Sequence, residues 1–75
     1  MQKHYSFTAL IEKEDDMFVS LCPELDIASQ GESVEIAKNN LKEAIELFFE
    51  TASDEEIKTR AHNEIFITRL EFAIA

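Results

Sequence analysis

The sequence predicts an α+β domain, in which a single four-stranded sheet carries its helices on one face. Three features predict this class. Apolar residues alternate along residues 5–11 and 64–74, residues 17–22 are apolar on both sides, and a helical stripe begins at residue 34. The expected order is strand, strand, strand, helix, short helix, strand. The helical crossover would let the last strand run parallel to the first.

The first two strands are expected to form a hairpin. Residues 5–11 alternate in the manner of a half-buried strand, and the polar residues 12–16 form the connection. Within that connection, Asp15 and Asp16 have turn-forming chemistry. Residues 17–22 are apolar on both faces, so this strand is expected at the centre of the sheet.

A corner and a third strand follow. Pro23 has no amide hydrogen, so the second strand should end at Cys22. Residues 26–30 are short and only partly apolar, which suits a strand near an edge. Gly31 is the only glycine, and we expect it to supply a backbone conformation that a Cβ would obstruct.

The longest element is an amphipathic helix. Ser33 stands at the N-cap position and Glu35 lies in the first turn, where its charge favours the helix dipole. Apolar residues at steps of three and four form one stripe: Val34, Ala37, Leu41, Ala44, Ile45, Phe48 and Ala52. Leu47 and Phe49 widen it and are the helix residues expected to reach a second subunit.

A short helix and a last strand complete the chain. Residues 53–56 have the spacing of a capping box, Ile57 and Ala61 would face inward, and Asn63 would end the helix. Residues 64–74 read as the fourth strand. Its two faces are Phe66, Leu70, Phe72 and Ile74, and Ile65, Ile67, Arg69 and Glu71.

Size and charge restrict the function classes. A chain of 75 residues forms one domain and buries only about 60% of its unfolded surface, so oligomerisation is a common remedy. The net charge of −9 argues against nucleic acid or an anionic membrane as a direct partner. The single Cys22, with no apolar span or signal peptide, predicts a cytoplasmic protein.

The pattern resembles a known family. It combines an acidic hairpin turn, the Cys-Pro-Glu-Leu corner at 22–25, Gln-Gly-Glu-Ser at 30–33, and Glu35 and Ala37 opening a helix. Over residues 4 to 50 this is similar to the HicB-like antitoxin domain. The resemblance implies a truncated ribonuclease-H-like fold whose fourth strand lies beside the first. It also implies neutralisation of a HicA-like toxin, a small ribonuclease whose catalytic histidine is blocked in the complex.

The sequence departs from that family at two points. Ile36 stands where a second glutamate often follows the cap, which weakens the cap. Full-length antitoxins of the family also carry a C-terminal ribbon-helix-helix or helix-turn-helix domain, whereas this sequence stops at Ala75. We therefore expect residues 1–75 to form a single domain without a DNA-binding part. Short stand-alone versions need not have a toxin partner, which leaves an oligomeric domain of unknown ligand as the alternative.

The residues do not suggest catalysis. The strands at 5–11 and 17–22 contain no acid, whereas a metal-dependent nuclease needs several converging carboxylates. His4, Cys22 and His62 lack the spacing of a zinc site. Cys22 is expected to be a small buried hydrophobe. We expect no enzyme activity, no metal and no cofactor.

The candidate partner-binding residues are acids and phenylalanines. The acids would form a surface complementary to a basic toxin, although a merely solvated loop surface explains them as well. They are Glu12, Glu14, Asp15, Asp16, Glu24 and Asp26. Phe18, Phe49 and Phe72 are the aromatic anchors to test for exposure.

Overall fold

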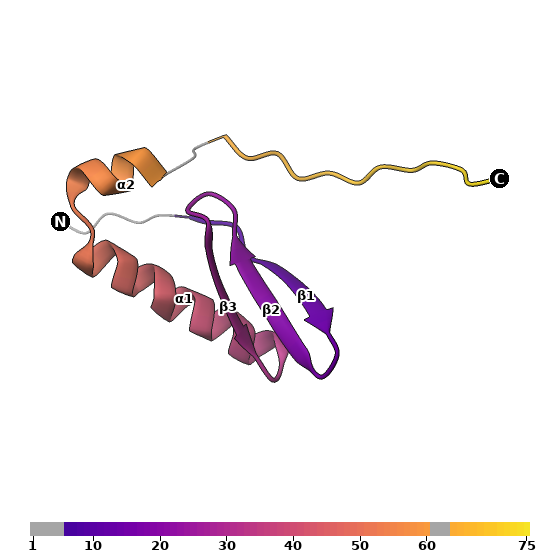
Figure 1. Ribbon diagram of the computed structural model, residues 1–75, viewed down its shortest axis with the longest axis horizontal. Helices are drawn as coiled ribbons and strands as arrows, with labels where there is room; N and C mark the ends of the chain where they lie inside the picture. Colours follow the sequence, from indigo (N-terminus) through magenta and orange to yellow (C-terminus); the bar gives the residue numbers. More distant parts are fainter. Residues whose placement is uncertain (1–5, 61–63) are drawn as a thin grey trace.

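The computed structural model describes residues 6–60 and 64–75. Three antiparallel strands form the sheet in the order β1-β2-β3 (Figure 1). They are β1 (Leu10–Glu14), β2 (Met17–Cys22) and β3 (Ile27–Gly31). The α+β class therefore holds, but the predicted four-stranded sheet is wrong for these residues.

The hairpin between β1 and β2 is tighter than predicted. Glu14 pairs with Met17, so the turn contains only Asp15 and Asp16, and Asp15 adopts a positive φ of 54°. The first strand was expected at 5–11 with a loop at 12–16, and both bounds are wrong. Glu12, Lys13 and Glu14 of the expected loop belong to the strand instead, which an edge strand tolerates because one of its sides faces water.

The centre of the sheet follows the prediction. β2 spans the expected residues 17–22 and pairs with both neighbours, and it ends immediately before Pro23. β3 begins one residue later than expected because Asp26 takes a left-handed conformation, with φ of 57°, and so completes the turn. Short polar residues tolerate this conformation better than most side chains do.

Helix α1 (Val34–Thr51) covers one face of the sheet (Figure 1). As predicted, Ser33 caps it: the Ser33 hydroxyl accepts a hydrogen bond of 3.1 Å from the amide of Ile36. The helix lies close to the sheet because the residues between them are small. The hydroxyl of buried Ser20 donates to the carbonyl of Ala37 at 2.9 Å. A Cβ on Gly31 would lie 2.6 Å from the backbone nitrogen of Ala37.

Gly31 is thus required for space rather than for backbone conformation, since its φ is not positive. The core lies next to this close contact, between α1 and the sheet. Cys22, Leu25 and Leu41 are completely or almost completely buried. Five partly buried side chains pack around them: Phe7, Ile27, Ile45, Phe48 and Phe49.

A second helix, α2 (Asp54–Arg60), follows α1. The hydroxyl of Ser53 accepts from the amide of Glu56 at 3.1 Å, so the predicted cap forms. Arg60 connects the C-terminal end of α2 to the β2–β3 turn, because its guanidinium donates to the carbonyls of Leu25 at 2.9 Å and Asp26 at 3.0 Å. The same group lies 5.2 Å from the centroid of the Phe48 ring. Ala61 and Asn63 lie outside the described residues.

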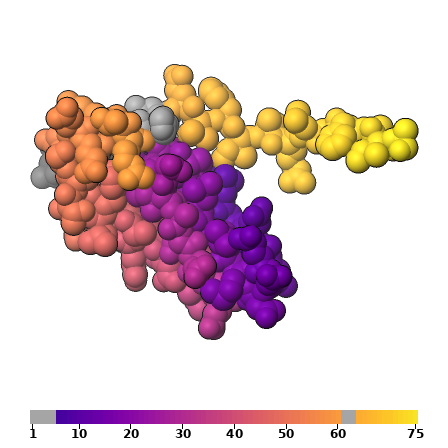
Figure 2. Space-filling view, in the orientation of Figure 1, coloured from indigo at the N-terminus to yellow at the C-terminus, as the bar shows by residue number. Residues whose placement is uncertain are grey.

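The tail, residues 64–75, does not join the sheet. It is extended and runs away from the body of the molecule (Figures 1 and 2). The fourth strand predicted at 64–74, parallel to the first, is therefore wrong. Alternating residues predict an extended backbone, but pairing depends on tertiary contacts that a local pattern does not contain. The radius of gyration is 14.8 Å, against about 11 Å for a compact chain of this length.

Candidate protein-docking surface

The face of the sheet turned away from α1 has no cover among the described residues. Side chains alternate along a strand, and Ser20 and Cys22 are buried on the α1 side, so Val19 and Leu21 point the other way. The strand register places Leu10 and Ala28 on either side of Leu21. It also places Glu12 opposite Val19. We call these five residues the open face: Leu10, Glu12, Val19, Leu21 and Ala28.

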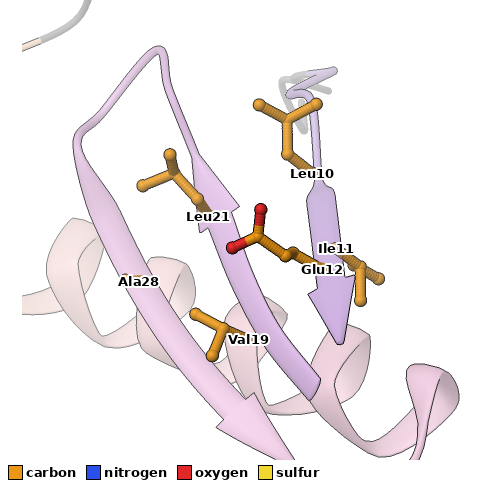
Figure 3. A pocket seen from close by; sticks show the side chains of 6 residues that line it. All are labelled: Leu10, Ile11, Glu12, Val19, Leu21 and Ala28. Carbon is orange, nitrogen blue, oxygen red and sulfur yellow. The ribbon is translucent and has the colours of Figure 1, made fainter. Parts of the chain in front are cut away.

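The open face forms a shallow hollow of about 480 Å³. Ile11 also contributes to its lining, although it pairs with Ser20 and so lies on the α1 side of the strand. Figure 3 shows the side chains of Leu10, Glu12, Val19 and Leu21 in front of the sheet, with α1 behind it. Leu10 is 40% exposed, and Val19 and Leu21 are only partly buried. Glu12 is the one charged residue of the lining. An exposed apolar patch bordered by polar residues marks a candidate protein contact.

The predicted acidic surface is divided between the two ends of the sheet. Asp15 and Asp16 form the β1–β2 turn beside Glu14, and Glu24 and Asp26 lie in the turn between β2 and β3. The six residues of β2 separate these turns by about 20 Å. Glu12 and Glu14 belong to β1 and therefore lie near the Asp15–Asp16 turn, not near Glu24 and Asp26.

Glu24 has partners within the chain. Its carboxylate accepts from the backbone nitrogen of Thr8 at 2.9 Å and from the Thr8 hydroxyl at 2.7 Å. The thiol of Cys22 also donates to it, at 3.6 Å. Burial raises the pKa of the Glu24 carboxyl, but the hydrogen bonds from Thr8 and from its own backbone outweigh burial and leave that pKa below its ordinary value. Glu24 thus holds the corner together.

The three predicted aromatic anchors have different surroundings. Phe18 is partly buried in β2, opposite Gly31. Phe49 packs against the core, with its ring centroid 5.8 Å from that of Phe7 and 5.5 Å from that of Phe48. Phe72 is 80% exposed in the tail. Phe72 is therefore the most exposed of the three.

Cys22 is completely buried, as its role as a small hydrophobe predicts. Burial raises the pKa of its thiol, and the nearby Glu24 carboxylate raises it further. Within residues 6–60 and 64–75, no three His, Cys, Asp or Glu side chains gather as a metal site would require. His4 and His62 lie outside the described residues. Neither helix in this part of the chain has the length and apolar character needed to cross a membrane.

The open face was not among the predicted binding residues. The apolar character of both faces of β2 could have indicated it, because a strand that is apolar on both faces needs cover on both faces. In the described residues α1 provides that cover on the side of Ser20 and Cys22, and Val19 and Leu21 on the other side remain without it.

Searches against protein-family models, curated proteins and solved structures found no match to this chain.

Proposed function

We propose that this chain is a protein-binding module of the antitoxin type, which masks a small, basic, HicA-like ribonuclease by direct contact. The open face is the observation that carries the proposal. It places Leu10, Val19 and Leu21 together in a hollow with solvent access, and Glu12 stands among them. Covering such a surface with a partner removes apolar area from water, which favours association.

Charge selects the partner. The chain has a net charge of −9, and Glu14, Asp15 and Asp16 lie at the end of the sheet next to Glu12. An RNA-binding ribonuclease presents a basic surface, because it must hold a phosphate backbone. Opposite charges on the two surfaces accelerate their encounter and reject acidic competitors. The resemblance of residues 4 to 50 to HicB-like antitoxins supports the same partner class.

The mechanism is steric and electrostatic. The apolar part of the open face would supply most of the affinity, since buried apolar anchors dominate binding energy. The acids at the hairpin turn would supply the association rate and occupy cationic positions that otherwise hold RNA. In this proposal the chain acts in the cytoplasm, where Cys22 stays reduced.

An oligomeric domain without a toxin partner is the second candidate. One observation favours it: the tail exposes large apolar side chains, among them Phe66 at 89% and Leu70 at 86%. A second copy of the chain is then the partner, and the open face has no foreign ligand.

Co-expression tests the antitoxin proposal. Any short basic open reading frame that adjoins this gene is induced in a heterologous host, with and without this chain, and growth is measured. We expect arrest without the chain and growth with it. Val19→Glu, on the open face, should abolish the rescue. Leu47→Glu is the matched control, because Leu47 is a 59% exposed apolar residue on α1, away from the open face.

Circular dichroism of both variants verifies that they fold. The proposal is contradicted if the wild-type chain does not restore growth, if the neighbouring frame is absent or harmless, or if both variants rescue equally.

A further inference from the structure

We infer that the tail of one copy pairs with the free edge of β1 in a second copy, so that two chains exchange their C-terminal strands. This inference does not rest on the antitoxin proposal. It follows from two features of the described residues: a segment with the sequence of a strand that joins no sheet, and a sheet edge that has no neighbour among them.

The tail has the chemistry of a buried strand. Its apolar face is almost fully exposed: Phe66 by 89%, Leu70 by 86%, Phe72 by 80% and Ile74 by 85%. Burying one such side chain is worth roughly 1.5–3 kcal/mol relative to leaving it in water. The alternation with Ile65, Ile67 and Arg69 places a second, mixed face on the opposite side. A strand with two usable faces fits into a sheet better than onto its surface.

The two edges of the sheet are not equivalent. At β3, the side-chain amide of Asn40 donates to the carbonyl of Gln30 at 2.8 Å, and α1 lies alongside. Residues Leu10–Glu14 of β1 have partners in β2, and the structure describes none on their outer side. An unpaired edge of this kind is a template for a strand from another chain. The vacant edge is therefore that of β1.

The faces of the tail match those of β1. Ile11 and the preceding Phe7 lie on the α1 side, and the apolar face of the tail would extend the core there. The other face of the tail would then continue the open face beside Leu10 and Glu12. It carries Arg69, the only basic residue of the tail, together with Glu71, on the side where β1 presents Glu12 and Glu14. Arg69 can pair with one of these acids, so a register that sets Arg69 rather than Glu71 opposite them is favoured.

A second copy, rather than the same chain, is the occupant because the tail points away from its own sheet (Figures 1 and 2). A reciprocal exchange also closes the assembly as a two-fold dimer and leaves no unpaired tail. The rings of Phe66 and Phe72 from two copies would bury roughly 600–1,000 Å² by themselves. A specific interface needs at least about 1,200 Å² in total, which the remaining tail residues and the β1 surface would supply.

The experiment combines mass measurement with hydrogen exchange on the full chain. Light scattering after size exclusion should give a dimer for the wild type. The variant Phe66→Glu with Phe72→Glu should be monomeric, with dimerisation weakened by tenfold or more. Leu47→Glu with Val34→Glu is the control, because it places two acids on exposed apolar positions of α1. This control should remain dimeric.

Exchange then locates the contact. Amides of residues 10–14 and 65–73 should be protected in the wild-type dimer and exchange faster in the tail variant. A wild-type monomer overturns the inference, whether its tail exchanges freely or is protected by its own sheet. A dimer that the α1 control dissociates and the tail variant does not would place the interface on the helix and overturn it equally. The inference is also overturned if both variants remain dimeric and the amides of residues 10–14 exchange freely.

Discussion

Glu24 accepts two hydrogen bonds from Thr8, one from its backbone nitrogen at 2.9 Å and one from its hydroxyl at 2.7 Å. This pair joins the extended segment before β1 to the turn after β2. It therefore fixes the chain at one end of the sheet, while the Asp15–Asp16 turn fixes it at the other. The glutamate of the Cys-Pro-Glu-Leu corner thus has a structural reason to be acidic.

Stability should fall with acid partly through Glu24. Because the folded-state pKa of Glu24 is lowered, its contribution is present above the ordinary glutamate pKa of about 4.3 and is lost as the pH falls through the lowered value. Chemical unfolding of the wild type and Glu24→Gln, measured from pH 7 down to pH 3, should give free energies that converge toward low pH. A constant difference across this range would contradict the role of the carboxylate. Thr8→Val serves as the partner control and should cost about 1 kcal/mol at pH 7.

Gly31→Ala should destabilise the protein, although alanine normally suits a strand better than glycine does. The new Cβ would lie 2.6 Å from the Ala37 nitrogen and 2.7 Å from Cγ2 of Ile36, so α1 would have to shift. Such overpacking costs about 1–3 kcal/mol, or a melting temperature lower by roughly 4–8 °C for each kcal/mol. Ala28→Gly is the control, because it makes the opposite change in the same strand but on the open face, away from α1. A melting temperature of Gly31→Ala equal to that of the wild type would refute the close contact.

Cys22 should be unreactive in the folded protein. Its thiol is completely buried, and its pKa is raised by burial and by the carboxylate of Glu24. At pH 8, a disulfide reagent such as Ellman's should label it slowly in buffer and within seconds in denaturant. Fast labelling in buffer would show that the corner opens readily, and a mutation that loosens it, such as Glu24→Gln, should accelerate labelling.

Arg60→Lys should release α2 without unfolding the sheet. The guanidinium makes two hydrogen bonds to the turn carbonyls and covers the Phe48 ring at 5.2 Å, and a lysine ammonium cannot reproduce this planar arrangement. Amides of residues 54–60 should lose hydrogen-exchange protection, while those of β2 keep theirs. Lys58→Arg, on an exposed position of the same helix, is the control. Equal protection of α2 in both variants would contradict the anchoring role.

The sequence was most informative where structure is local. The Ser33 cap, the apolar stripe of α1 and the end of β2 at Pro23 each follow from neighbouring residues. The bounds of β1 were missed because residues 12–14 are charged, and their strand conformation comes from pairing with β2 rather than from their own preference. Arg60 was not identified, since its carbonyl partners lie far away in the chain.

The tail also shows that a local sequence pattern does not determine which strands pair. Its alternation does produce an extended backbone, but the pattern contains no information on which edge, or which copy of the chain, the segment would pair with. The open face was also not predicted, because the apolar residues of β2 do not show which of its two faces the helix covers. Its identification needed the position of α1 on the Ser20 side.

The most direct measurement of the central claim is a nuclear magnetic resonance titration. The isotope-labelled full chain is titrated with a purified basic HicA-like ribonuclease, and the amide shifts are mapped onto the structure. The account predicts saturable shifts at Leu10, Glu12, Val19, Leu21 and Ala28, with the solvent-exposed side of α1 unaffected. Absence of saturable shifts, or shifts confined to α1, would contradict a docking role for the open face.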